Sequence, residues 1–241
     1  MNRVNSPDAV AVIPAHNEAA RLRRCVRSVL AAAAEVPGQV VTVVVLDACT
    51  DGSAQIVRRF GSTVHALSID ARNVGAARAA GFAYARDMLA ANVAGRCWYA
   101  TTDADSCVDS DWLVRQMAAG ADMVLGVVRI GNWRHIPTSV ARRYMRRYRF
   151  RPDEDSPAHG HIHGANMGFS AEAYWEVGGF AALSSGEDVD LVDGFTRRGY
   201  RVRYDSALSV VTSARPDGRA PNGFAAHLRS MLHRSTAEEP A

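Results

Sequence analysis

Residues Val40–Asp47 read VVTVVVLD, an apolar and largely β-branched run that ends on a carboxylate. Such a run predicts a strand that is buried on both faces, as in the middle of a parallel sheet. The segments on either side alternate between strand-like and helix-like patterns. Strands are expected at Val10–Pro14, Val64–Ile69 and Trp98–Thr102, and helices at Arg21–Ala34, Ser53–Phe60 and Gly75–Leu89. This rhythm predicts an α/β fold with a doubly wound, mostly parallel sheet flanked by helices.

The chain fits a single domain. Its 241 residues are enough for one sizeable α/β domain, which we expect over residues 1–234, followed by a disordered tail at 235–241. No apolar run approaches the roughly 20 residues needed to cross a bilayer, and no secretory leader opens the chain. We therefore expect no transmembrane segment and a cytoplasmic location, with attachment at the membrane surface as an alternative.

Composition excludes several kinds of chemistry. All 28 of the Lys+Arg residues are arginine, so a Schiff-base lysine or a P-loop lysine is impossible. The four cysteines are scattered without a CxxC motif, which indicates reduced thiols rather than a zinc knuckle or a disulfide framework. A net charge of +3 is too small to indicate nucleic-acid binding by itself.

Polar clusters follow three of the expected strands, at Pro14–Glu18, Asp47–Ser53 and Asp103–Ser106. In open α/β sheets ligands bind beyond the carboxyl ends of the strands, so these clusters predict a ligand-binding edge. A dinucleotide site would need glycines in the first of these turns, and Pro14–Glu18 has none. Asp47 taken alone is also consistent with a turn that leads into a capped helix.

The carboxylates of Asp103 and Asp105 lie in the segment TTDADS, residues 101–106. One interpretation makes the first a nucleophile for phosphoryl transfer, as in the haloacid dehalogenase superfamily, but the chain has no lysine to balance the charge and several strands precede the pair. In another, the pair holds Mg²⁺ or Mn²⁺ between two phosphates of a nucleotide, since these ions prefer oxygen ligands. An exposed acidic turn is the third interpretation, because Asp109 and Asp111 follow closely.

Six motifs occur in order along the chain. They are IPAHNE at Ile13–Glu18, LDACTDGS at Leu46–Ser53, NVGAARAAG at Asn73–Gly81, TTDADS at Thr101–Ser106, HGANMGFS at His163–Ser170 and GEDVDL at Gly186–Leu191. With this set, the sequence resembles the family 2 glycosyltransferases, which have the GT-A fold, over roughly Ala9–Thr212. The resemblance implies a metal-dependent, inverting transfer of a sugar from a nucleoside-diphosphate sugar to an acceptor hydroxyl, with Mg²⁺ or Mn²⁺ as the cofactor.

The resemblance also implies a division of roles, with a nucleotide-sugar half at about 9–106 and an acceptor half at about 107–234. The implied donor-binding residues are Pro14, Ala15, His16, Asn17, Glu18, Asp47, Asn73, Gly75, Arg78, Asp103, Ala104 and Asp105. Asp105 would be the direct metal ligand, with Asp103 closer to the ribose and the metal-bound water. The implied catalytic base is Asp188, with Glu187 as the alternative. The implied acceptor-side residues are His163, Gly164, Ala165 and Asn166, which open onto a short strand at Asn166–Ser170.

The sequence departs from the family pattern in three places. Ala79 follows the arginine of the third motif where asparagine is common, and Gly178-Gly179 lie further from Glu187 than is usual. Neither change removes a charged group. The QxxRW motif of processive synthases is absent, and this favours transfer of a single sugar.

Two segments allow other functions. His159, His161 and His163 alternate and would share one face of a strand, as a zinc site requires, although a polar acceptor-binding loop is the favoured interpretation; His227 is the one further histidine considered as a metal ligand. The arginine-rich segment 142–151 is consistent with a solvated helix, an anionic acceptor, or a membrane surface that carries a lipid acceptor. A nucleotide-sugar-binding or nucleic-acid-binding protein without turnover is the alternative from another functional class, but nucleic acid leaves the six motifs unexplained.

Overall fold

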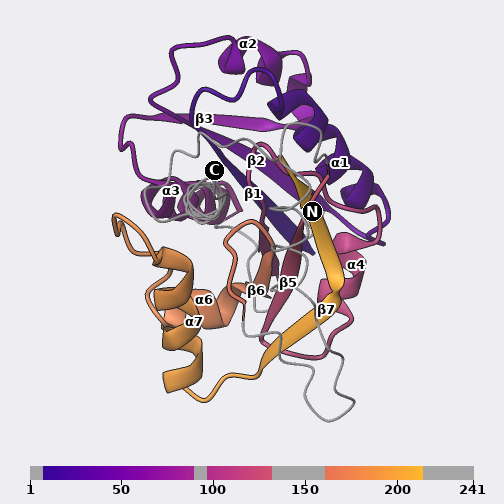
Figure 1. The fold of residues 1–241 in the computed structure, drawn as a ribbon, viewed down its shortest axis with the longest axis vertical. Helices are drawn as coiled ribbons and strands as arrows, with labels where there is room; N and C mark the ends of the chain where they lie inside the picture. The colour runs from indigo at the N-terminus through magenta and orange to yellow at the C-terminus, as the bar shows by residue number, and fades with distance from the viewer. Residues whose placement is uncertain (1–7, 90–96, 132–160, 214–241) are drawn as a thin grey trace, which may run out of the picture.

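The stretch Val40–Asp47 forms strand β2 and lies between β3 and β1 (Figure 1). The computed structural model describes residues 8–89, 97–131 and 161–213 of the chain. Within these ranges a sheet of seven strands runs in the order β3-β2-β1-β4-β6-β5-β7. The strands are β1 (Ala9–Ala15), β2, β3 (His65–Ile69), β4 (Trp98–Thr101), β5 (Met123–Ile130), β6 (Met167–Ser170) and β7 (Val202–Thr212).

The sheet is mixed, with one antiparallel strand near its middle. Strands β1 to β4 are parallel to one another, and β5 is parallel to β7. Strand β6 is antiparallel to both of its neighbours, β4 and β5. The order 3-2-1-4 reverses direction between β1 and β4, which is the switch point where open α/β sheets bind ligands. The expected doubly wound, mostly parallel sheet is confirmed.

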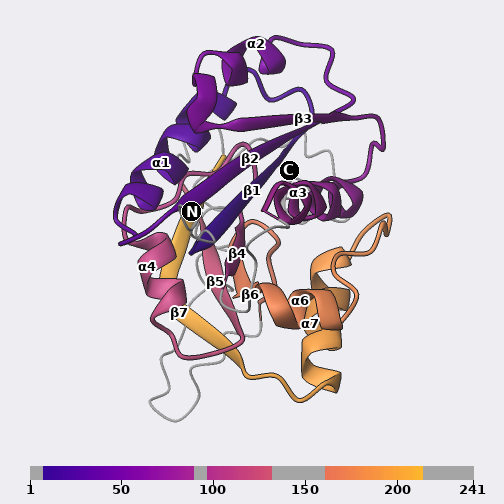
Figure 2. The same cartoon turned by 180° about the vertical axis from the view of Figure 1, so that it is seen from behind.

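Helices cover both faces of the sheet, as the two opposite views show (Figures 1 and 2). They are α1 (Leu22–Ala34), α2 (Ser53–Arg58), α3 (Val74–Leu89), α4 (Trp112–Met117), α6 (Ala171–Glu176) and α7 (Glu187–Arg197), with a short 3-10 turn at Gly61–Thr63. Helices α1, α2 and α4 bury Val26, Val57 and Trp112 against one face. Helices α3, α6 and α7 bury an aromatic cluster, including Phe82 and Tyr174, against the other.

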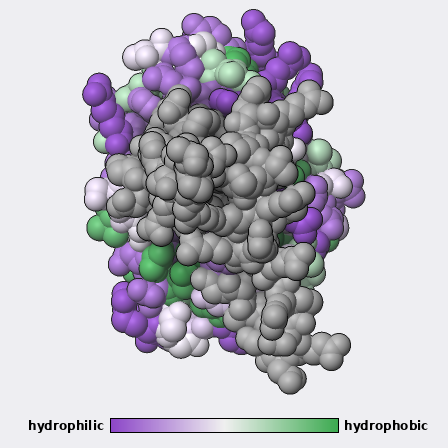
Figure 3. Space-filling model, in the orientation of Figure 1, coloured by the Kyte–Doolittle hydropathy of each residue, from purple (hydrophilic) through white to green (hydrophobic). Residues whose placement is uncertain are grey.

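The described surface that Figure 3 leaves visible beside the grey residues is mostly hydrophilic. Four large apolar side chains are exposed in the described ranges, those of Val74, Met88, Leu183 and Val189. No helix in these ranges is long and apolar enough to span a membrane. The arginine-rich segment 142–151, His159, His227 and the expected tail 235–241 lie outside the described residues.

A bulge in β7 is filled by the side chain of Asn166. Gly126 of β5 pairs with Asp205, but the next residue, Val127, pairs with Ser209. The Asn166 amide nitrogen donates to the backbone oxygens of Val127 and Leu208, both at 3.0 Å. Its Oδ1 accepts from the indole N–H of Trp112 at 2.9 Å. Asn166, assigned by resemblance to the acceptor side, is therefore buried and joins β5, β7 and α4.

We expect Asn166→Ala to lower the free energy of unfolding by about 2–5 kcal/mol, because two carbonyls and one indole N–H would lose their partner in the interior. Urea unfolding measures the loss. Gln55→Ala, which removes an exposed amide on α2, is the matched control and should change the stability by less than about 0.5 kcal/mol. Equal, small effects of both substitutions would contradict the role given to Asn166.

Candidate functional site

The loops that follow β1 and β2 are bound together at the switch-point edge. The Oδ1 of Asn17 accepts from the backbone N–H of Thr50 at 2.7 Å, and the backbone N–H of Glu18 donates to Ser53 Oγ at 3.0 Å. The backbone N–H of Ala19 donates to an Asp51 carboxylate oxygen at 2.9 Å. The polar clusters predicted at these two strand ends thus meet in space.

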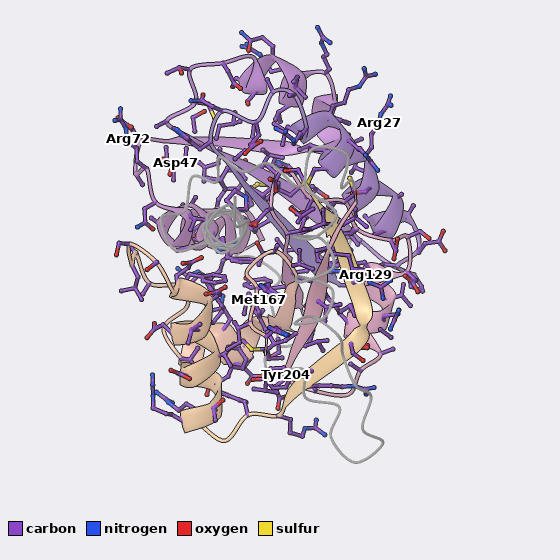
Figure 4. The ribbon with its side chains drawn as sticks, in the orientation of Figure 1. Arg27, Asp47, Arg72, Arg129, Met167 and Tyr204 are labelled. Atoms are coloured by element: carbon purple, nitrogen blue, oxygen red, sulfur yellow. The ribbon has the colours of Figure 1, made fainter. Side chains whose placement is uncertain are left out.

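Asp47 organises the loop between β3 and α3. Its buried carboxylate accepts hydrogen bonds from the backbone N–H groups of Ala71, Arg72 and Asn73, all at 2.8 Å. These bonds occupy three of the roughly four lone-pair positions of a carboxylate. Arg72 points outward from the loop while Asp47 lies beneath it (Figure 4). The carboxylate of Asp47 therefore holds the backbone of residues 71–73 in place.

His16 follows β1 and contacts the end of β2. Its ring is half-buried, and Nδ1 lies 2.6 Å from the backbone oxygen of Asp47. Asn17 and Ala48, the residues that follow these two contacting groups, both have left-handed backbone conformations, with φ of 51° and 48°. Left-handed backbone is unfavourable for a non-glycine residue other than Asn or Asp, so the surrounding contacts hold Ala48 in place.

The DxD loop after β4 is fixed by residues that the sequence did not single out. The two carboxylate oxygens of Asp105 accept from Thr212 Oγ1 at 3.3 Å and from Ser213 Oγ at 2.9 Å. Cys107 and Val211 exchange two backbone hydrogen bonds, which ties the loop to the end of β7. Hydroxyl residues at a strand end are common, so no sequence signal marks Thr212 or Ser213 as partners of a residue more than a hundred positions away.

Arg78 lies at the centre of the site. Its guanidinium is buried and donates to Glu187 Oε1 at 2.5 Å and to Asp103 Oδ1 at 2.8 Å. It also lies over the ring of Phe180, 5.4 Å from the centroid. Burial lowers the pKa of Arg78, but the attraction of Asp103 and Glu187 raises it further, so the net pKa lies above its usual value. The guanidinium stays charged and joins α3 to both carboxylates.

Two glycines make room for this arrangement. A Cβ on Gly164 would lie 2.5–2.7 Å from the guanidinium atoms of Arg78. A Cβ on Gly75 would lie 2.2 Å from the backbone oxygen of Ala181 and 3.1 Å from Glu187 Cβ. Both glycines, assigned to the site by resemblance, are thus needed for close approach rather than for a side-chain function.

The Asp103 carboxylate sits among like charges. Burial raises its pKa to about 6; Arg78 opposes this rise, and the nearby Asp105 and Glu187 add to it. Since 41% of the Asp103 side chain is exposed, solvent screens part of these interactions. A second positive charge beside Asp103 and Asp105 would be favourable at this edge.

The two carboxylates of the ED pair have different surroundings. Glu187, the first residue of α7, is buried and paired with Arg78. Asp188 is more exposed, and its oxygens accept backbone N–H bonds from Gly164 and Val189, both at 2.9 Å. The acceptor-side loop and the ED pair, which the sequence placed together by resemblance alone, are therefore in direct contact.

The described part of the histidine cluster consists of His161 and His163. Their rings stack nearly parallel, with centroids 5.9 Å apart. Among the described residues, no group of three or more His, Cys, Asp or Glu side chains has the arrangement of a metal site. The carboxylates of Asp103 and Asp105 lie close enough for their charges to interact.

Comparison with known proteins identifies the family. The sequence profile of glycosyl transferase family 2 matches residues 10–178, well over half of the chain. The chain belongs to glycosyl transferase family 2. This membership confirms the resemblance and makes the protein a glycosyltransferase. No curated protein sequence matches this glycosyltransferase.

Solved structures show that the glycosyltransferase has the GT-A fold. The mannosyltransferase PcManGT from Pyrobaculum calidifontis, in complex with GDP-Man and Mn²⁺, is 17% identical, with a TM-score of 0.64 over 99% of this chain and 77% of that chain. Residues 1–349 of TarS from S. aureus, in complex with UDP-GlcNAc, are 14% identical, with a TM-score of 0.63 over 97% of this chain and 67% of that chain. At these identities the likeness concerns the fold alone.

We expect a strong energetic coupling between Arg78 and Glu187. Arg78→Met leaves a carboxylate buried without its partner and should lower the free energy of unfolding by about 3–5 kcal/mol. Adding Glu187→Gln should recover more than about 1 kcal/mol of that loss. A double-mutant cycle in urea measures the coupling.

The exposed pair Arg72 and Asp70, 3.5 Å apart, provides the control cycle. Arg72→Met and Asp70→Asn should couple by less than about 1 kcal/mol, because both side chains are solvated. A buried-pair coupling no larger than that of the exposed pair would show that the guanidinium does not join the two elements.

Proposed function

We propose that the chain is a metal-dependent, inverting glycosyltransferase that moves one sugar from a nucleoside-diphosphate sugar to an acceptor hydroxyl. One observation carries the proposal: the buried Arg78 binds Asp103 of the DxD loop and Glu187 of the helix that presents Asp188. An inverting displacement needs a stabilised leaving group on one side of the sugar and a base on the other. Through its two contacts Arg78 fixes the DxD loop, the candidate for the leaving-group side, relative to the ED pair, the candidate for the base side.

The DxD residues fit a hard divalent cation. Asp103 and Asp105 supply carboxylate oxygens. The hydroxyl groups of Thr212 and Ser213 donate to the two oxygens of Asp105 and orient its carboxylate. In this proposal Asp105 would hold Mg²⁺ or Mn²⁺ directly, and Asp103 would be the residue closer to the ribose. The cation, when bound, would offset negative charge on the departing diphosphate. The presence of Mn²⁺ with GDP-Man in PcManGT supports this choice.

The nucleoside would lie against the loops after β1 and β2. Pro14–Glu18 and Asp47 form the edge next to the DxD loop, and Asp47 fixes Asn73 and the start of α3. Arg78 already donates to two carboxylates, so its role is to hold Asp103 in position and to keep a positive charge beside the diphosphate. The donors bound by TarS and PcManGT, UDP-GlcNAc and GDP-Man, support a nucleotide-sugar donor for this chain.

Asp188 is the better base of the ED pair. Glu187 Oε1 accepts a hydrogen bond from the buried guanidinium of Arg78, so this oxygen is already occupied and lies away from an acceptor hydroxyl. Asp188 is half-exposed and adjoins the 161–166 loop through Gly164. In the proposed step the acceptor oxygen bonds to the anomeric carbon, its proton moves to Asp188, and the bond to the diphosphate oxygen breaks.

Asp105→Ala should abolish metal-dependent nucleotide binding and leave the fold intact, because it removes the direct metal ligand. Mn²⁺ with UDP or GDP should stabilise the unchanged protein by about 2.7 kcal/mol at a hundredfold excess over the Kd, and thermal unfolding measures this. Asp109→Ala, an exposed carboxylate just beyond the loop, is the control and should keep the effect. Stabilisation of the Asp105→Ala variant by Mn²⁺ and nucleotide would contradict the metal assignment.

Asp188→Asn should lower turnover by roughly 10²–10⁴-fold, the usual contribution of a general base, while donor affinity is kept. Glu187→Gln should reduce turnover less, and Asp190→Asn, which changes an exposed carboxylate in the same helical turn, should have almost no effect. Single-turnover assays with the acceptor separate chemistry from binding. Near-normal turnover of both ED variants would remove the pair from the proton transfer.

A further inference from the structure

The outer faces of α1 and α2 carry a concentration of positive charge. Helix α1 buries an apolar stripe against the sheet, so Arg23, Arg24 and Arg27, which lie between the residues of that stripe, are exposed. Figure 4 shows Arg27 pointing outward, away from the sheet. Arg58 and Arg59, at the end of α2, are also exposed. We call these five arginines the basic face.

The packing of the two helices brings these charges to one side of the molecule. Helices α1 and α2 contact each other and pack on the same face of the sheet. Both lie at the same end of the molecule in the two opposite views (Figures 1 and 2). Like charges in one area of the surface repel one another, and an anionic partner would offset that repulsion.

No carboxylate of these two helices balances the basic face. Residues 19–34 and 53–69 contain six arginines and no aspartate or glutamate. Within the described part of the chain, no ion pair joins any of the five arginines to a carboxylate. The exposed Arg72, in contrast, lies 3.5 Å from Asp70. The charge of the basic face is therefore open to an external anion.

The side chains around these arginines favour a lipid surface over a nucleic acid. Proteins that bind single strands add aromatic side chains on which the bases stack. The large apolar side chains exposed in the described ranges include no aromatic one and none from α1 or α2; they are Val74, Met88, Leu183 and Val189. A bilayer needs no such platform, because its anionic headgroups move laterally to meet a basic surface.

We propose that the basic face binds the anionic headgroups of a lipid bilayer and holds the glycosyltransferase against the membrane surface. The binding is reversible, because it relies on charge without an apolar anchor. The candidate site lies next to this face: residues 14–18 lead directly into α1, and the backbone N–H of Arg21 donates to the Glu18 oxygen at 2.9 Å. The inference does not depend on the proposed metal ligand or base.

Co-sedimentation of the full chain with vesicles tests the proposal. Vesicles of phosphatidylglycerol and phosphatidylcholine in equal parts should bind the protein at about 0.1 M salt, where charges act over about 10 Å. They should release it at about 1 M salt, where the range falls to about 3 Å. Vesicles of phosphatidylcholine alone should bind little protein, because they carry no net charge.

A triple variant locates the binding surface. Changing Arg23, Arg24 and Arg27 to glutamine should lower the partition coefficient by about a hundredfold, because each basic residue near an anionic surface contributes about fivefold. Lysine at the same three positions should keep the binding, since the attraction depends on charge rather than on the guanidinium group.

The matched control changes three exposed arginines at the other end of the chain's described part, Arg197, Arg198 and Arg201, to glutamine. Each triple glutamine variant removes three positive charges from a net charge of +3, so the comparison isolates position from total charge. The control should weaken binding by less than about fivefold, the contribution of a single arginine at the membrane.

A second variant keeps the test independent of the folding of α1. Changing Arg58 and Arg59 to glutamine should lower the partition coefficient by about twenty-fivefold, from the same contribution per residue. Unfolding temperatures without vesicles show which variants are folded.

The outcomes are distinct. Salt-sensitive binding to anionic vesicles that is lost in the α1 variant and kept in the lysine variant and the control supports the proposal. Absence of binding to anionic vesicles overturns it, and so does equal binding by the α1 variant and the control. Tighter binding to duplex DNA than to vesicles of the same phosphate concentration also overturns it, because the basic face would then serve a nucleic acid.

Discussion

The guanidinium of Arg78 lies between two carboxylates from distant parts of the chain, Asp103 in the loop after β4 and Glu187 at the start of α7. Removing either carboxylate would leave part of a buried positive charge without compensation, and removing Arg78 would leave Glu187 buried without its partner. This geometry requires glycine at two positions. A side chain at Gly164 would displace the Arg78 guanidinium, and a side chain at Gly75 would displace Glu187 and the start of α7. The proposed leaving-group and base sides are thereby fixed relative to each other.

A buried network of this kind restricts motion at the reacting centre. The segments that carry the two partners of Arg78 have further contacts. Ser213 and the Cys107–Val211 pairing hold the DxD loop, and Asp188, next to Glu187, accepts from the backbone N–H of Gly164. Charged groups that are already oriented need little rearrangement when charge develops on a substrate, which is how preorganised sites lower a barrier. The apparent excess of carboxylates at one edge is consistent with a site that receives a cation.

Much of the fold follows from the sequence, because β-branched runs such as Val40–Asp47 have few alternatives to a buried parallel strand. The predicted alternation of the first four strands with three helices along the chain is confirmed. The antiparallel placement of β6 does not follow, since periodicity carries no information on strand direction. The bulge beside Gly126 depends on Asn166, a residue whose type alone suggests a polar loop rather than a buried hydrogen-bonding side chain.

The site divides in the same way. The resemblance groups Asp47, Arg78, Asp103 and Glu187 in one site. The sequence does not reveal that the Asp47 carboxylate accepts three backbone N–H bonds, or that Glu187 rather than Asp188 forms the ion pair with Arg78. Such roles depend on which groups lie within hydrogen-bond distance after folding, and a motif specifies only residue types.

Anomalous diffraction from crystals grown with Mn²⁺ and a nucleoside diphosphate tests the central claim most directly. The account predicts a manganese peak at coordination distance from the Asp105 carboxylate, a diphosphate bound to the metal, and Arg78 still paired with Asp103 and Glu187. A manganese and diphosphate bound away from the DxD loop, or an Arg78 released from Glu187 in the complex, would contradict it.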